Sequence, residues 1–172
     1  MRRTNDNTII IIEDDPDDQQ ILKEVFEDLD YPNKIIFFSD GQSALDFLNR
    51  TDVIPFLILS DINMPKLDGF ALRNKIKMDA ELQLKCIPYI FFSTATNQKA
   101  VVDAYSLSVQ GFFVKDDKFE DLKDTIETIM KYWHKCVAPN HFTADGVKIS
   151  QPEINKEAFA ENNSIQDREI KG

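Results

Sequence analysis

The chain has 172 residues, of which 42% are hydrophobic and 29% are charged, and these are the proportions of a globular protein rather than of a disordered or fibrous chain. Its net charge of −10 argues against nucleic acid as a direct partner, because an acidic surface repels phosphate groups. No apolar run approaches the roughly 20 residues that a membrane helix needs, and the first residues lack the long apolar segment of a signal peptide. We therefore expect a cytoplasmic protein without a membrane span.

Five short runs of β-branched, aromatic and other apolar residues predict strands at 8–12, 35–38, 56–60, 89–92 and 111–114. After each run, apolar residues recur at helical spacing, which predicts helices at about 16–29, 41–48, 69–78, 99–106 and 119–134. Asp15 is the predicted N-cap of the first helix, with Pro16 at its first position. A continuous run such as the first one is typical of a strand that is covered on both faces.

This alternation of strands and helices predicts the α/β class, with a doubly wound fold in which a parallel five-stranded sheet carries helices on both faces. Right-handed crossover connections leave few topologies for such a sheet. The predicted domain spans residues 7–136. Residues 137–172 show no apolar periodicity, so we expect a C-terminal tail with little intrinsic structure.

Polar side chains follow the carboxyl ends of four predicted strands. They are Glu13-Asp14-Asp15 after the first strand, Asp61 after the third, Ser93-Thr94 after the fourth and Lys115 after the fifth. In a doubly wound sheet, the loops at this edge form the functional site. Carboxylates on neighbouring strands, which lie about 4.8 Å apart, repel one another, and a hard divalent cation such as Mg²⁺ offsets that repulsion through oxygen ligands.

Each of these groups also has an ordinary structural explanation when it is taken alone. Acids in the first turn of a helix favour the helix dipole, which accounts for Asp15, Asp17 and Asp18 as capping or solvated residues. A Ser-Thr pair after a strand is usually a cap or a turn, and a single lysine such as Lys115 is usually solvated. The coincidence of acids after two strands, a hydroxyl after a third and a lysine after a fourth favours a site instead.

Four segments resemble the receiver domain of two-component response regulators. They are Ile9–Pro16 with the sequence IIIIEDDP, Leu57–Gly69 with LILSDINMPKLDG, Pro88–Ala95 with PYIFFSTA, and Gly111–Lys115 with GFFVK. The resemblance covers roughly residues 7–136 and implies a flavodoxin-like sheet in the strand order 2-1-3-4-5. Tyr132-Trp133 and the Glu-Asp pair are similar to single-domain regulators associated with phytochrome-type histidine kinases.

The resemblance implies that Asp61 accepts a phosphoryl group from a phosphohistidine of a histidine kinase. Glu13, Asp14, Asp61 and the backbone carbonyl of Asn63 would bind the cofactor Mg²⁺, which offsets charge on the phosphoryl oxygens during transfer. No separate enzyme activity is expected, because such a domain catalyses only its own phosphorylation and dephosphorylation.

The resemblance also assigns a lysine and a switch. Lys115 would pair with Asp61 and later with the phosphoryl group. Ser93 stands at the position of the switch hydroxyl, and Thr94 takes that role if the alignment shifts by one residue. Phe112 occupies the aromatic switch position. Lys115 is followed by Asp116 rather than by the usual proline, so we expect a trans peptide bond there.

The expected function is that of a single-domain response regulator in a two-component phosphorelay. It would signal through protein contacts on the face of the fourth helix, fifth strand and fifth helix, because no effector domain follows. The sequence does not identify the downstream protein, and a homodimer is one of the expected possibilities. One alternative is a receiver fold that serves as a scaffold without phosphorylation. Another is a phosphohydrolase with an aspartate nucleophile, which requires an acid two residues after Asp61, where Asn63 stands.

Overall fold

A computed structural model describes residues 7–137 of the chain. The tail predicted at 137–172 lies outside the described residues, apart from Val137. Five parallel strands form one sheet in the order β2-β1-β3-β4-β5, which confirms the predicted fold class and strand order. The strands are β1 (Ile9–Ile12), β2 (Ile35–Phe38), β3 (Leu57–Ser60), β4 (Tyr89–Ser93) and β5 (Gly111–Val114).

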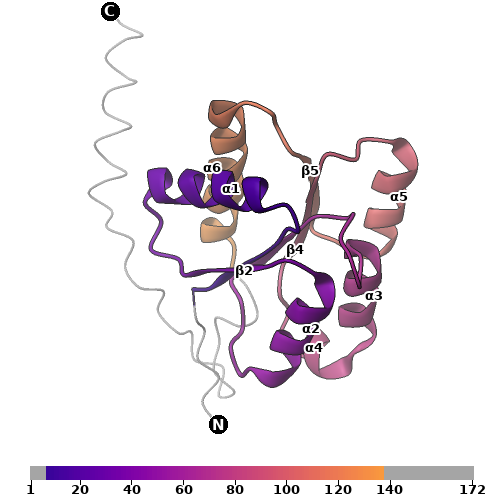
Figure 1. Cartoon of the computed structure of the whole chain (residues 1–172). Coiled ribbons are helices and arrows are strands. Elements are labelled where there is room, and N and C mark those ends of the chain that lie inside the picture. Colours follow the sequence, from indigo (N-terminus) through magenta and orange to yellow (C-terminus); the bar gives the residue numbers. More distant parts are fainter. Residues whose placement is uncertain (1–6, 138–172) are drawn as a thin grey trace, which may run out of the picture. The chain divides into compact units, whose positions relative to one another are not determined.

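Helices cover both faces of the sheet (Figure 1). They are α1 (Pro16–Leu29), α2 (Gly41–Arg50), α3 (Gly69–Met78), α4 (Ala80–Leu84), α5 (Gln98–Ser106) and α6 (Phe119–Lys135). α1 and α6 pack on one face against Ile9 and Ile11, whereas the core on the other face, under α2 to α5, contains Ile10 and Ile12. This division follows from the alternation of side chains along a strand. Among residues 7–137, no helix is long and apolar enough to cross a membrane.

The element boundaries fall close to those predicted from the sequence. The predicted cap of α1 is confirmed, since the Asp15 side chain accepts hydrogen bonds from the N–H groups of Asp17 and Asp18 at 2.8 and 3.3 Å. Pro16 is the first residue of α1. β4 runs one residue further than predicted, so Ser93 is the last residue of this strand rather than the first residue of the loop.

The short helix α4 is an element that the sequence pattern does not predict. Asp79 ends α3 and caps α4, because its side chain accepts from the N–H groups of Glu81 and Leu82 at 2.9 and 3.0 Å. Leu82 is the one buried residue of the five in α4. An element of this length is too short to show helical periodicity, so the capping aspartate is its main sequence signal.

The two strands that lead to the predicted acids lie inside the sheet, whereas β2 lies at its edge. All four residues of β1 and of β3 are buried, because both strands pair on both sides and are covered on both faces. Within the part of the chain that the structure describes, β2 pairs with β1 alone, and its residues are half-buried. The carboxyl ends of β1 and β3 therefore lie in the middle of the sheet, where neighbouring elements shelter the residues that follow.

Candidate functional site

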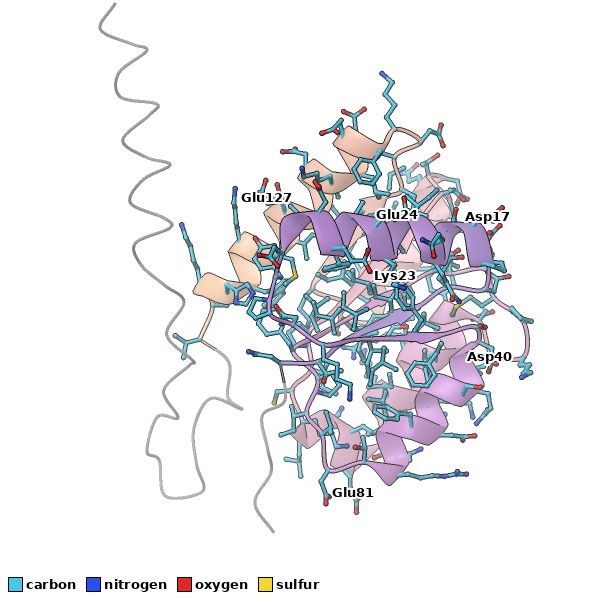
Figure 2. The ribbon with its side chains drawn as sticks, turned by 60° about the vertical axis from the view of Figure 1, so that its left-hand side comes forward. Asp17, Lys23, Glu24, Asp40, Glu81 and Glu127 are labelled. Carbon is cyan, nitrogen blue, oxygen red and sulfur yellow. The ribbon has the colours of Figure 1, made fainter. Side chains whose placement is uncertain are left out.

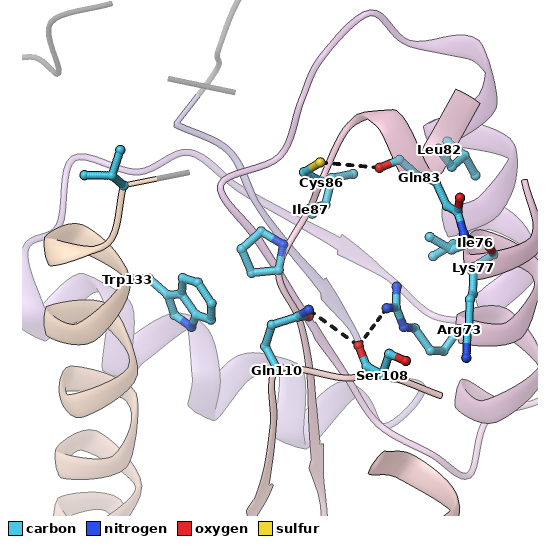
Figure 3. Close-up of a pocket in the computed structure, with 12 residues that line it drawn as sticks. Arg73, Ile76, Lys77, Leu82, Gln83, Cys86, Ile87, Ser108, Gln110 and Trp133 are labelled. Carbon is cyan, nitrogen blue, oxygen red and sulfur yellow. Dashed lines mark hydrogen bonds between the residues drawn. The ribbon is translucent and has the colours of Figure 1, made fainter. Parts of the chain in front are cut away.

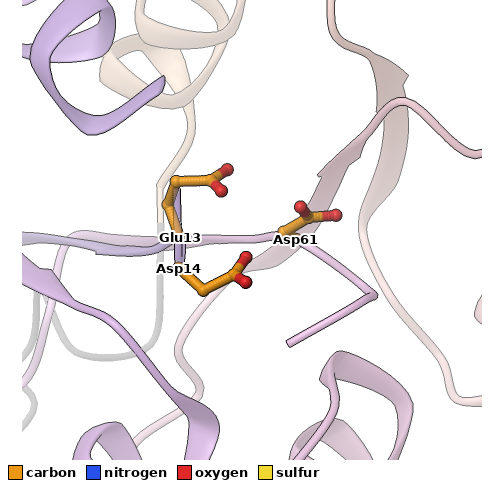
Figure 4. A group of neighbouring side chains, drawn as sticks. All are labelled: Glu13, Asp14 and Asp61. Carbon is orange, nitrogen blue, oxygen red and sulfur yellow. The ribbon is translucent and has the colours of Figure 1, made fainter. Parts of the chain in front are cut away.

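Glu13, Asp14 and Asp61 come together at the carboxyl edge of the sheet (Figure 4). β1 and β3 pair in parallel with Ile12 opposite Ser60, so the residues that follow the two strands emerge side by side. The N–H of Asp61 donates to the carbonyl of Ile12 at 2.9 Å and continues this pairing. One carboxylate oxygen from each of the three acids lies within 4.8 Å of the other two.

The chemistry of this cluster fits a hard divalent cation. Glu13 is only 2% exposed, Asp61 is half-buried and Asp14 is exposed. Three carboxylates at this separation repel one another, and burial removes the water that would screen them. All the donors are oxygen atoms, and the exposed side at Asp14 leaves room for water ligands. Mg²⁺ prefers oxygen ligands and keeps several waters, so this donor set suits it.

Lys115 follows β5 and places its ammonium group against the same acids. Its Nζ donates to a carboxylate oxygen of Glu13, to Asp18 at 3.0 Å and to Asp61 at 3.2 Å, and its side chain is only 9% exposed. Burial lowers the pKa of Lys115, but the contacts with Glu13, Asp61 and Asp18 raise it more, so the pKa lies above its ordinary value. The ammonium therefore stays protonated at neutral pH and offsets part of the negative charge.

Glu13 is held in place by its neighbours along the chain as well as by Lys115. The N–H of Asp15 donates to Oε1 of Glu13 at 3.1 Å, and the side chain of Gln19 donates to the backbone carbonyl of Glu13 at 2.5 Å. Burial raises the pKa of the Glu13 carboxyl, and the hydrogen bond and charge of Lys115 offset only part of this rise. The first two turns of α1 thus fix one of the candidate metal ligands.

Asp18 is a contact of the site that the sequence interpretation missed. That interpretation assigns it, with Asp15 and Asp17, to the capping or solvated first turn of a helix. Asp15 caps α1 and Asp18 lies in its first turn, as that interpretation predicts, but the Asp18 carboxylate, whose side chain is 40% exposed, also contacts Lys115. A signal was available, because helical side chains point back toward the N-terminus of their helix, and α1 begins beside the strand end.

The predicted switch residues lie at the end of β4 and within β5. Ser93 is fully buried. Its carbonyl accepts from the N–H of Lys115 at 3.0 Å, and its hydroxyl accepts a backbone N–H two residues further on at 3.3 Å. Thr94 is exposed. Phe112 is half-buried, and its ring centre lies 6.3 Å from that of Phe91. The peptide bond after Lys115 is trans, as expected.

The loop at 61–68 carries both Asp61 and Asn63. The N–H of Ile62 donates to Oδ1 of Asp61 at 2.6 Å, and the N–H of Gly69 donates to the carbonyl of Ile62 at 2.8 Å. A Cβ atom on Gly69 would lie 2.2 Å from the carbonyl oxygen of Asp61, so a larger residue would displace the acid. Asn63 lies two residues after Asp61 with its side chain exposed.

A cavity of about 460 Å³ lies elsewhere in the molecule, beside α3, α4 and the residues that precede β4 and β5 (Figure 3). Its lining includes Arg73, Lys77, Gln110 and Trp133. The predicted site residues do not line this cavity, and they follow the opposite ends of the strands. The candidate site is thus the cluster of charges at the carboxyl edge.

The parallel sheet, the acids after β1 and β3 and the lysine after β5 are those of a response regulator receiver domain. The sequence model of that family matches residues 9–127, and the chain belongs to the family. Among its relatives, the probable methanogenesis regulatory protein FilR2 of Methanothrix harundinacea is 33% identical over 129 residues, which cover 73% of this chain and 82% of that protein. Response regulator Rcp1 of Synechocystis is 30% identical over 134 residues, which cover 75% of this chain and 90% of Rcp1.

Solved structures agree with this assignment. The phosphorylated cyanobacterial phytochrome response regulator RcpA matches with a TM-score of 0.69 at 27% identity, over 78% of this chain and 99% of that chain. The Mn²⁺-bound form of response regulator Rcp1 matches with a TM-score of 0.68 at 28% identity, over 77% of this chain and 99% of that chain. The chain is therefore a receiver domain of two-component signalling, and its similarity to phytochrome response regulators is confirmed.

Proposed function

We propose that Asp61 accepts a phosphoryl group from a phosphohistidine of a histidine kinase, in a reaction that requires Mg²⁺. The observation that carries this proposal is the position of Asp61 at the end of β3, between two further carboxylates and an ammonium group. Its carboxylate oxygen lies within 4.8 Å of those of Glu13 and Asp14, and Lys115 Nζ lies 3.2 Å from its Oδ2. The phosphorylated and Mn²⁺-bound states of its structural relatives support the same chemistry.

In the proposed transfer, a carboxylate oxygen of Asp61 attacks the phosphorus atom. An O–P bond forms as the N–P bond of the kinase phosphohistidine breaks, and the histidine nitrogen leaves with the electron pair. Glu13, Asp14, Asp61 and the Asn63 carbonyl would hold Mg²⁺, which when bound supplies positive charge against the phosphoryl oxygens. The other contribution of the chain is to hold Asp61 in line with the phosphorus atom.

Lys115 supplies the second positive charge of the proposed reaction. Its pKa lies above the ordinary value, so the group is an ammonium ion at neutral pH. In the unphosphorylated site the ammonium contacts Glu13, Asp18 and Asp61. After transfer we expect it to contact a phosphoryl oxygen, while Asp18 remains available as a carboxylate partner outside the metal-binding cluster.

The test uses acetyl phosphate as the phosphoryl donor in the presence of Mg²⁺. We expect the full chain to gain about one phosphoryl group, detected by mass and by its sensitivity to hydroxylamine, and Asp61→Asn to gain none while its circular dichroism is unchanged. Labelling of a folded Asp61→Asn variant at the wild-type level would disprove the assignment. A wild-type chain that takes no label would instead favour a scaffold without phosphorylation.

Ser93 and Phe112 are the proposed switch. A hydroxyl group can donate one hydrogen bond to a phosphoryl oxygen, and we expect the movement of Ser93 toward that oxygen to let Phe112 pack inward. Ser93→Ala should accept the phosphoryl group but show no change in self-association or partner binding afterwards. If Thr94→Ala shows that behaviour and Ser93→Ala does not, the switch hydroxyl belongs to Thr94.

The wider setting is inferred from the same residues. Residues 7–136 contain every proposed site residue, so a chain that is truncated after Cys136 should still be labelled. We infer a histidine kinase and a downstream protein as partners, without direct DNA contact, and the cytoplasm as the site of action. The domain would catalyse only its own phosphorylation and dephosphorylation. If the full chain is a dimer in solution and the truncated chain is a monomer, the tail lies in the homodimer interface.

A further inference from the structure

The loop at 61–68 is anchored to the core along its inner side. Ile62, Met64 and Leu67 are buried and belong to the core under α2 and α3. Between them, Asn63 and Lys66 are exposed. The apolar anchors fix the inner side of the loop, whereas Asn63 and Lys66 do not belong to the buried core. Asn63, whose carbonyl is a proposed Mg²⁺ ligand, belongs to the exposed part of the loop.

An ion pair fastens the exposed side of the loop to α2. Lys66 Nζ lies 3.0 Å from Oδ2 of Asp40, and the Asp40 side chain is only 9% exposed although that of Lys66 is 67% exposed. Asp40, which Figure 2 labels, is the N-cap of α2. Its two oxygens accept from the N–H and the hydroxyl of Ser43 at 2.8 and 2.9 Å. The N–H of Ser43 and, to a smaller extent, Lys66 hold the pKa of Asp40 below its ordinary value, so the carboxylate is ionised at neutral pH.

The backbones of α2 and the loop also meet at this point. A Cβ atom on Gly41, the first residue of α2, would lie 2.3 Å from the carbonyl oxygen of Leu67. Lys66 itself has φ of 63°, in the left-handed region that residues with a side chain seldom adopt. A disfavoured backbone conformation persists where the surrounding contacts hold it, and the pair with Asp40 is such a contact.

We propose that Lys66 and Asp40 are positioning residues, whose ion pair fixes the backbone of the loop at 61–68 so that the Asn63 carbonyl is in place before Mg²⁺ binds. A loop that is ordered in advance loses less conformational entropy when the metal binds, so the pair raises the affinity for Mg²⁺ without touching the ion. The inference rests on the proposed function, because it takes the Mg²⁺ site from it.

The test replaces Lys66 with Met, which has a side chain of similar size and the same difficulty with the left-handed region, so only the charge changes. We expect the Mg²⁺ dissociation constant, measured by NMR titration, to rise about threefold. Without metal, the amide hydrogens of Leu67 and Gly69, which bond to Pro65 and Ile62, should exchange faster. Asp40→Asn, which keeps a good N-cap but loses the charge, should give the same two changes, and Lys66→Arg should restore wild-type behaviour.

Lys123→Met is the matched control. Lys123 forms an ion pair with Asp28 that joins α6 to α1, away from the loop. Loss of the Lys123–Asp28 ion pair should alter neither the Mg²⁺ affinity nor the hydrogen exchange of the amides in the loop at 61–68. Wild-type affinity and wild-type exchange in a folded Lys66→Met variant would overturn the inference, as would equal effects in Lys123→Met. The exchange measurement needs no metal and no phosphoryl transfer, so a failure of the proposed function is seen separately in the labelling of Asp61→Asn.

Discussion

The two edges of the sheet are built from different kinds of residue. At the carboxyl edge, Glu13, Asp61 and Lys115 are charged groups that are largely withdrawn from water. At the amino edge, before the strands begin, the ring of His134 stacks on Tyr31 at 5.4 Å and lies 4.7 Å from Phe56. The first edge holds acids that repel one another and a lysine that offsets part of this repulsion, whereas the second holds aromatic ring contacts.

This difference separates the chemistry of the domain from its stability. Repulsion among the acids at the carboxyl edge opposes folding, and Lys115 offsets only part of it. Aromatic and aliphatic packing at the amino edge and in the two cores favours folding. We therefore expect substitutions at the carboxyl edge to change Mg²⁺ binding and phosphorylation more than stability, and substitutions at the amino edge to do the reverse.

Phe56→Ala should give the largest change in stability. The ring is half-buried and packs in the core under α1 and α6, so its removal should lower the free energy of unfolding by about 2 kcal/mol. Labelling by acetyl phosphate under folding conditions should stay at the wild-type level. Urea unfolding measures the first effect and mass spectrometry the second. A loss of labelling in the folded variant would show that the two edges are coupled.

Asp14→Asn should weaken Mg²⁺ binding without lowering stability. Losing one of three clustered carboxylates should weaken Mg²⁺ binding about tenfold, which corresponds to about 1.4 kcal/mol. The free energy of unfolding without Mg²⁺ should rise slightly, because one like-charge repulsion is removed. NMR titration and urea unfolding of the same sample measure the two effects. A less stable variant with unchanged Mg²⁺ affinity would contradict the separation of roles.

Thr8→Val should stabilise the amino edge. Thr8 is fully buried, and its hydroxyl oxygen has no hydrogen-bond partner among residues 7–137. Valine has nearly the same shape without the polar atom, so the free energy of unfolding should rise by about 1 kcal/mol. The carbonyl of Thr8, which accepts from the N–H of Phe56, is unaffected. Lower stability would mean that a buried water molecule satisfies the hydroxyl.

His134 should give the smallest effect, as a dependence of stability on pH. Burial lowers its pKa below the ordinary 6.5, so the unfolded chain binds a proton more readily than the folded one. The free energy of unfolding should therefore fall as pH decreases through 6.5 toward the folded-state pKa. His134→Phe, which retains a ring between Tyr31 and Phe56, should remove this part of the pH dependence. An unchanged pH profile, measured by urea unfolding from pH 7.5 to 5, would disagree with this assignment.

The sequence predicted the sheet and the acidic cluster well because both depend on local patterns. Apolar runs mark the buried strands, and in a parallel sheet the residues that follow the strands meet at one edge. The strand order that the resemblance implies places β1 beside β3, so the proximity of Glu13, Asp14 and Asp61 needs no knowledge of side-chain packing. The cap at Asp15 was also predictable, since it depends on the next few residues alone.

The contacts that sequence reasoning missed are those between residues far apart in the chain. Asp18 contacts Lys115 across 97 positions, and Lys66 contacts Asp40 across 26. From the sequence, each of these acids is explained by its own helix terminus. The backward tilt of helical side chains points Asp18 toward the strand end, but it does not identify Lys115 as the partner. Which turn of α1 faces β5, and how the loop at 61–68 lies on α2, are set by packing of the two cores.

The edge position of β2 has a consequence for handling the protein. Its residues, Ile35–Phe38, are all large and apolar, and within residues 7–137 one side of the strand has no neighbour in the sheet. Such a segment can pair with a copy of itself when the chain is partly unfolded, which leads to aggregation. Lys34 and Asp40 flank it with charges of opposite sign, and the strand is only four residues long. We therefore expect concentrated solutions of the native protein to stay soluble. Aggregation should begin under mild denaturant or heat, when the chain starts to unfold.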